Sequence, residues 1–329
     1  MKEEGPLGKP LRDLIDIIQF TGTVSAKIHG LLDEAEICRT VREEFAKSKR
    51  YRAAILLLTD DGSKLRVAEI SESSRKLRTA ERVAGLRLKE FKIDLKKSSI
   101  YSQVVKEGKT LRVRDIDIAG ELFPRPLAYL VSKIMGYEKR ESIVTPLYRH
   151  EKIIGALIMS SPELADFFIP SVRNFAQQIS TAMELAHENV EHKRAEEALR
   201  ESEERYRSLV ELAPDGIVTL NLKGEFTSIN AAFTKLTGYS RDEIVGKHFT
   251  KAATVYASAI PKYLKLFSAL LRGRGKVPIT FEFIYRRKNG TIGWGETHGR
   301  LIEERGKKVV LAILRDITER KRAEGELIR

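Results

Sequence analysis

Residues 166–213 run for 48 residues without a glycine, and their single proline, Pro170, lies near the start. Proline is tolerated there because the first N–H groups of a helix have no partner within the helix. Hydrophobic positions recur at alternating spacings of four and three, which is the heptad pattern of a coiled coil. The run is Phe168, Val172, Phe175, Ile179, Ala182 and Ala186, and after a slip near Val190 the spacing resumes at Ala195, Leu199, Ser202, Tyr206 and Leu209. This pattern predicts one long helix.

Such a helix would reach roughly 70 Å at about 1.5 Å per residue, which is more than one small domain can cover. Glutamates that precede arginines by four residues, such as Glu196 and Arg200, support an exposed helix. An apolar stripe left in water forfeits about 25 cal/mol per Å², and the simplest cover is a second copy of the same helix. We therefore predict a parallel homodimer, although the spacing also allows antiparallel pairing. The predicted contact residues are Phe168, Val172, Phe175, Ile179, Leu199, Tyr206 and Leu209.

Strand, turn and helix patterns on both sides of this helix predict two α+β domains. The chain opens with amphipathic helix, and residues 75–98 are basic and poorly patterned. The strand-forming segments before the long helix are the hairpin "RAAILLLTDDGSKLRVAEIS", the helix and strand of "IYSQVVKEGKTLRVRDI", and the two strands of "ESIVTPLYRHEKIIGALIMSS".

After the long helix, "APDGIVTLNLKGEFTSIN" predicts a hairpin, and a helix over residues 257–272 leads to three more strands. Asn289-Gly290 is a hairpin turn between the first two of these strands. One face of the first strand carries alternating aromatic residues, Phe281, Phe283 and Tyr285. Asp316 and Glu319 have the spacing of a capping box that starts a last helix.

Composition limits the class of protein. The longest apolar runs, residues 53–58 and 309–314, are far shorter than the roughly 20 residues that span a bilayer, and the N-terminus lacks the apolar segment of a signal peptide. The single cysteine, Cys38, excludes an internal disulfide, so we predict a cytoplasmic protein without membrane contact. Residues 251–300 hold ten Lys/Arg against two Asp/Glu, but without a recognition motif this basic stretch favours a solvated face over nucleic-acid binding.

Two sets of motifs resemble known families. "INAAFTKLTGYSRDEIVGKHF", "RRKNGTIGWGETHGRLIEERGK" and "LAILRDITERKRAE" resemble a PAS domain with its C-terminal motif. "AAILLLTDDGSKLRVAEIS", "VVKEGKTLRVRDI" and "SIVTPLYRHEKIIGALIMSS", leading into "FAQQISTAMELAHENV", resemble a GAF domain. The expected organisation is an N-terminal helix (1–29), a GAF-like domain (30–165), a coiled-coil linker (166–212), a PAS-like domain (203–318) and the start of an exit helix (319–329).

This resemblance implies two antiparallel-sheet sensory domains joined by a signalling helix. The repeated "KRAE", at residues 193–196 and 321–324, then belongs to helices that link such modules in tandem. We expect a non-catalytic, dimeric signal-transduction module that binds a small ligand or a protein partner, such as a downstream kinase or regulator. Two alternatives are the sensor half of a histidine kinase whose catalytic domains are absent from this chain, and a transcriptional regulator that uses the basic surface.

Candidate catalytic and metal sites are weak. His187 and His192 lie five residues apart, roughly 140° around a helix, so they cannot share one metal ion. The His187-Glu188 pair lacks the continuation of a kinase phosphoacceptor. His150 and His248 fall at turn-like positions and are expected at the surface. We therefore predict no metal site and no enzymatic activity.

The resemblance also indicates which cofactors to test against this sequence: haem, flavin and bilin. A haem-binding PAS domain of the familiar kind has a histidine on the helix predicted at 257–272, and this segment has none. A flavin photosensor needs a cysteine, and residues 203–329 contain none. Bilin attachment needs a suitably placed cysteine, whereas Cys38 falls on a leading helix. Haem, a flavin adduct and bilin are therefore not expected.

A small-molecule pocket is still possible in the PAS-like domain, where the alternative is that the same residues only fill a core. The candidate lining residues are Asn230, Phe233, Tyr263, Phe267, Phe283 and Trp294. At the joint between the last strand and the exit helix, Asp316 and Thr318 are expected to pass a change in the sheet to that helix.

Overall fold

The computed structural model describes residues 8–88, 90–252, 254–272, 279–304 and 306–326, with the side chains of 257, 279 and 326 excepted. Parts of the expected terminal segments, residues 1–7 and 327–329, lie outside this range. The chain divides into two compact units between Ala195 and Glu196. No helix in the described ranges has the length and hydrophobicity needed to cross a membrane.

The first unit is built on a six-stranded antiparallel sheet with the order β3-β2-β1-β6-β5-β4. Its strands are β1 (Arg52–Leu58), β2 (Lys64–Ile70), β3 (Lys92–Asp94), β4 (Leu111–Arg114), β5 (Glu141–Arg149) and β6 (Lys152–Ser161). The predicted hairpin is confirmed: Gly62 adopts a left-handed φ of 66°, and Asp61 accepts hydrogen bonds from Thr59 and Ser63. The short polar turn therefore closes by its own side chains.

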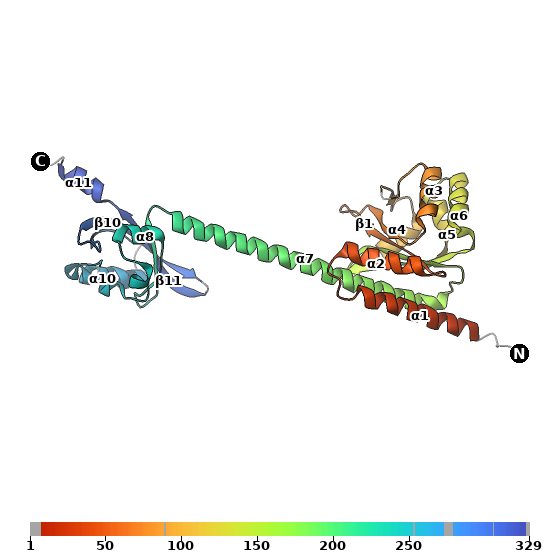
Figure 1. Ribbon diagram of the computed structural model, residues 1–329, viewed down its shortest axis with the longest axis horizontal. Helices are drawn as coiled ribbons and strands as arrows, with labels where there is room; N and C mark the ends of the chain where they lie inside the picture. The colour runs from red at the N-terminus through yellow and green to blue at the C-terminus, as the bar shows by residue number, and fades with distance from the viewer. Residues whose placement is uncertain (1–7, 89, 253, 273–278, 305, 327–329) are drawn as a thin grey trace. The chain divides into compact units, whose positions relative to one another are not determined.

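Helices cover both faces of this sheet, so the central strands β1, β5 and β6 are mostly buried (Figure 1). One face carries α1 (Gly8–Ile28), α2 (Glu34–Lys47) and the first part of α7 (Ile169–Leu212). The other carries α3 (Ser74–Ala84), α4 (Ser99–Glu107), α5 (Asp115–Leu122) and α6 (Arg125–Met135). The segment 75–98, which lacked a pattern, contains most of α3 and strand β3. Helix α3 has no buried residue, which explains its weak apolar signal.

The long helix is confirmed as α7, but the structure corrects four of the seven predicted dimer contacts. Its first part packs against α1 and α2 of the same chain, where Phe45 and Phe175 stack with ring centroids 5.7 Å apart. Four predicted contact residues are at most 2% exposed: Phe168, Val172, Phe175 and Ile179. A side chain already buried within one chain cannot contact a second, so the prediction for these four is wrong. Leu199, Tyr206 and Leu209 are 62%, 67% and 65% exposed.

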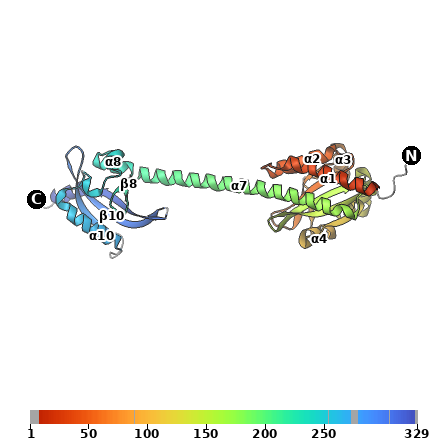
Figure 2. The same ribbon diagram turned by 90° about the horizontal axis from the view of Figure 1, so that it is seen from below.

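The second unit has a five-stranded antiparallel sheet with the order β8-β7-β11-β10-β9. Its elements are β7 (Gly216–Leu220), β8 (Phe226–Ile229), α8 (Ala231–Thr237), α9 (Arg241–Ile244), α10 (Ile260–Leu271), β9 (Ile279–Arg286), β10 (Ile292–Glu304), β11 (Lys307–Asp316) and α11 (Thr318–Glu326). Both predicted hairpins are present, and the turn at Asn289-Gly290 has Gly290 at a φ of 85°. Residues from α8, α9 and α10 form one core with β7, β8 and β11. Helices α8 and α10 lie beside this sheet (Figure 2).

A candidate ligand cavity and its helix joint

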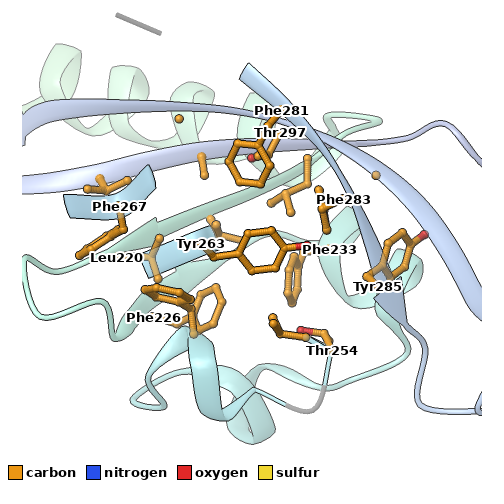
Figure 3. Close-up of a pocket in the computed structure, with 18 of the residues that line it drawn as sticks. Leu220, Phe226, Phe233, Thr254, Tyr263, Phe267, Phe281, Phe283, Tyr285 and Thr297 are labelled. Carbon is orange, nitrogen blue, oxygen red and sulfur yellow. The ribbon is translucent and has the colours of Figure 1, made fainter. Parts of the chain in front are cut away.

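The second unit encloses a cavity of about 170 Å³ between its sheet and helices α8 and α10. Figure 3 shows the Tyr263 ring of α10 reaching into this space, towards the aromatic residues of β9. Its centroid lies 5.5 Å from that of Phe281 and 6.4 Å from that of Phe283. Most of the wall is apolar, and the hydroxyls of Thr254 and Thr297 are among its few polar groups. The lining fits an uncharged guest.

The space exists because β10 presents small residues to β9. Gly295 is paired with Phe283 across the two strands. A Cβ atom added at Gly295 would lie 2.5 Å from the Cζ atom of Phe283, so the phenyl ring lies directly over the glycine. Thr297 and Gly299 follow on the same face and also line the cavity. The predicted alternation of aromatic residues on β9 therefore faces a row of small residues on β10.

Four of the six predicted pocket residues line this cavity. They are Phe233, Tyr263, Phe267 and Phe283. Trp294 does not, because residues on alternate positions of β10 point to opposite faces, and Trp294 pairs with Ile284 rather than with an inward aromatic. Its ring instead has the ammonium of Lys321 5.6 Å from its centroid. The prediction for Trp294 is therefore wrong.

Asn230 is also absent from the cavity wall, because its side chain holds the backbone together. Its Oδ1 accepts hydrogen bonds from the amides of Ile217 (2.8 Å) and Phe233 (3.1 Å). Its Nδ2 donates to the carbonyls of Val210 (2.8 Å) and Asp215 (3.0 Å). Both donors and both acceptor positions are used, which leaves none for a ligand. Asn230 is a structural tie between the end of α7, β7 and α8.

Asp316 lies in the cavity wall, at the end of β11 and two residues before α11. Its carboxylate accepts hydrogen bonds from the Tyr285 hydroxyl (2.9 Å), from Nη2 of Arg287 (2.7 Å) and from the Thr318 amide (2.8 Å). Burial raises the pKa of Asp316, but the hydrogen bonds from Thr318 and Tyr285 and the charge of Arg287 outweigh it, so the pKa lies below its usual value. Burial and the bond to Asp316 raise the pKa of Tyr285 to about 12.

Thr318 completes the joint between sheet and helix. Its hydroxyl donates to Asp316 and accepts a hydrogen bond from the Trp294 amide at 2.9 Å. The amide of Ile317 donates to the Trp294 carbonyl at 2.8 Å. Further along α11, Lys321 forms an ion pair with Glu282 at 2.8 Å. Strands β9, β10 and β11 are thus all hydrogen-bonded or ion-paired to the first turns of α11.

Titratable groups in the first unit include one cluster that the sequence pattern did not reveal. Ligand atoms of His150, Glu184 and Glu188 lie within 4.8 Å of one another, on the β5–β6 turn and one face of α7. His187 lies apart from this group, with its Nδ1 3.6 Å from Glu34. Cys38 is buried in the core, and burial raises the pKa of its thiol to about 12. Its thiol is therefore unreactive at neutral pH.

Comparison with known proteins assigns both units. The family model of the GAF domain matches residues 33–186, and that of the PAS domain matches residues 214–319. Sporulation kinase C of Bacillus subtilis is 34% identical over 132 residues, which are 39% of this chain and 29% of that protein. Cell-division control histidine kinase PdhS of Brucella ovis is 34% identical over 160 residues, 46% of this chain and 14% of that protein.

The match spans less than a third of these two relatives. Among solved structures, the PAS domain of an HTR-like protein from Haloarcula marismortui is 27% identical, covers 38% of this chain and 99% of its own, and has a TM-score of 0.31. The two resemblances seen in the motifs are confirmed by the family models. The chain therefore carries a GAF domain followed by a PAS domain and is a sensory module of signal transduction.

Proposed function

We propose that this chain is a non-catalytic sensor whose PAS cavity binds a small, uncharged, mainly apolar molecule and reports its presence through α11. The observation that carries this proposal is the position of Asp316. It belongs both to the cavity wall and to the hydrogen-bonded start of the exit helix. A change at the wall therefore has a direct route to the helix.

The size and lining of the cavity define the ligand class. A volume of about 170 Å³ is close to the roughly 150 Å³ of an apolar cavity that holds benzene. A charged guest would lose its hydration without a free partner, because Asp316 and Arg287 already neutralise each other at 2.7 Å. A single-ring molecule with at most one polar group, within reach of Thr254 or Thr297, fits this wall best.

Tyr285 is the residue that would transmit occupancy. Its ring lines the cavity, and its hydroxyl donates to Asp316. A ligand that displaces this ring changes the hydrogen bonds that the Asp316 carboxylate accepts from Thr318. The start of α11 then has two arrangements, with and without its hydrogen bonds to Asp316. The ligand shifts the equilibrium between them by the difference in its binding free energy for the two.

A second copy of the chain is the proposed partner of the exposed stripe on the later part of α7. The stripe retains Leu199, Tyr206 and Leu209 from the predicted seam. The relatives named as kinases support a kinase as the downstream output, either as a separate partner or as domains absent from this chain. The alternative regulator would use the basic stretch at 251–300, part of which, residues 273–278, lies outside the described residues.

Binding of toluene, followed by calorimetry, tests the cavity. Ala312→Phe fills the cavity from β11 and should abolish binding, whereas Ile313→Phe, at the neighbouring position outside the cavity lining, should not. Hydrogen exchange of the α11 amides should change with toluene in the wild type and in Ile313→Phe only. Equal toluene binding by both variants would refute the site, and binding without any change in α11 would refute the coupling.

A further inference from the structure

The GAF domain contains a second cavity, of about 140 Å³, between its sheet and helices α3, α5 and α6. Most of its wall is apolar. The apolar contributors include Leu77 of α3, Ile118 and Leu122 of α5, and Met135 of α6. The volume again corresponds to one ring or a short branched chain. Unlike the PAS cavity, this one has a cluster of buried charged and hydroxyl groups at one end.

The first residue of α5, Asp115, lies at that polar end and is only 3% exposed. Its Oδ1 accepts a hydrogen bond from the Ser142 hydroxyl, which in turn shares a 2.6 Å hydrogen bond with the Ser160 hydroxyl. Its Oδ2 is buried and has no hydrogen-bond partner. A buried carboxylate oxygen without a donor is costly, and such groups in native proteins call for an explanation.

The neighbouring charges do not supply that partner, because they gather on another carboxylate. Glu72 is ion-paired with Arg140, with Arg52 at 3.7 Å and with Lys76 at 3.8 Å. Three cations thus share Glu72, while Oδ2 of Asp115, a residue of the cavity lining, has no hydrogen-bond donor. The group that the cavity lacks is therefore a donor or cation next to Asp115.

Two tyrosines complete the polar end. Tyr101 and Tyr137 line the cavity, and the charge of Asp115 adds to the effect of burial on both phenols. Burial raises the pKa of both phenols, so they stay neutral and offer aromatic surface rather than negative charge. Aromatic faces attract cations, which adds to the pull of the carboxylate.

We propose that this cavity binds a small protonated amine with a single-ring apolar body, whose ammonium group donates to Oδ2 of Asp115. The ammonium would satisfy the buried oxygen, and the body would fill the space among Leu77, Leu122 and Met135. An ordered water would satisfy the oxygen too, but it would leave the apolar part of the cavity empty. The site is separate from the PAS cavity, so the two proposals can fail independently.

Calorimetric titration of the full chain with 2-phenylethylamine at pH 7.5 tests the proposal. A hydrogen bond between charged groups contributes about 1.5–3 kcal/mol, so Asp115→Asn should weaken binding by at least about tenfold. Asp117→Asn is the matched control, because this exposed acid on the same helix is paired with Arg114. The control should bind like the wild type. No binding by the wild type, or equal binding by Asp115→Asn, overturns the proposal.

The pH dependence of the wild type gives a readout that needs no variant. Burial raises the pKa of Asp115, Ser142 and Arg140 partly offset this effect, and the resulting pKa is about 6. The amine, with a pKa near the 10.4 of lysine, stays charged between pH 5 and 7.5. Protonation of Asp115 at pH 5 should therefore weaken binding by about tenfold. An affinity that is constant over this range would refute the role of Asp115.

Discussion

Replacing Asp316 with alanine should destabilise the PAS domain and release the first turn of α11. The substitution removes four hydrogen bonds at once, from the Thr318 amide and hydroxyl, the Tyr285 hydroxyl and the Arg287 guanidinium. Arg287 keeps hydrogen bonds to the carbonyls of Leu236 and Ile292, so it would not be left without partners. The damage is therefore concentrated at the joint.

The expected cost is about 2–3 kcal/mol. Hydrogen bonds to a charged group contribute about 1.5–3 kcal/mol each when buried, but the Asp316 side chain is 26% exposed. In the variant, water can thus hydrogen-bond some of the donors that the carboxylate had satisfied. The loss in stability is therefore well below the sum of four buried hydrogen bonds. The figure still exceeds the roughly 1 kcal/mol of a simple helix cap, because the carboxylate also ties down β9.

Trp294 makes the measurement specific to this domain. It is the only tryptophan in the sequence, and it lies on β10 with its amide bonded to Thr318. Urea unfolding followed by tryptophan fluorescence therefore reports the PAS domain within the full chain. Asp242→Ala, which removes an acid from the exposed part of α9, is the control and should shift stability by less than about 0.5 kcal/mol.

The difference between Asp316→Ala and the wild type should depend on pH. The folded-state pKa of Asp316 lies below the ordinary aspartate value of 3.8, so the stabilisation by its carboxylate is fully present above that pH. It is lost as the pH falls through the folded-state pKa. The two proteins should differ at pH 7, and the difference should shrink as the pH falls below 3.8. A loss below about 0.5 kcal/mol at pH 7 would refute the reasoning, and a variant without any folded PAS domain would place Asp316 in the core instead.

Leu209→Lys should shift the chain towards monomer in sedimentation velocity, whereas Ser208→Lys, away from the exposed stripe of α7, should not. A wild type that is already monomeric at tens of micromolar, which corresponds to an association free energy of about −6 to −7 kcal/mol, would contradict the dimer. Ile179→Lys should instead destabilise the GAF domain by more than about 3 kcal/mol, because Ile179 is 0% exposed within its own chain. A thermal unfolding curve by circular dichroism that matches the wild type would contradict this. Asn230→Ala should lower the free energy of unfolding of the PAS domain by about 2–4 kcal/mol in urea, against about 1 kcal/mol for Asn221→Ala in a hairpin turn. Equal losses would show that the hydrogen bonds of Asn230 contribute no more than those of an ordinary turn.

Local signals in the sequence determined the modules and their order. A run of 48 residues without glycine predicts helix whatever surrounds it, and the turn at Asn289-Gly290 closes a hairpin by its own backbone preference. The alternation of Phe281, Phe283 and Tyr285 places all three on one face, since side chains of a strand alternate. These features depend on neighbours in the chain, so they could be predicted without a tertiary structure.

The tertiary structure decided which partner each pattern meets. A heptad stripe indicates that a face will be covered, but not by what: α1 and α2 cover Ile179, while Leu209 stays exposed. Trp294 and Asn230 were misplaced because strand register and hydrogen-bond capacity are set by contacts that are distant in sequence. The same holds for Asp115, which meets Ser142 only because β4, the strand directly before it, pairs with β5. It also holds for both cavities, which are spaces that no local pattern encodes.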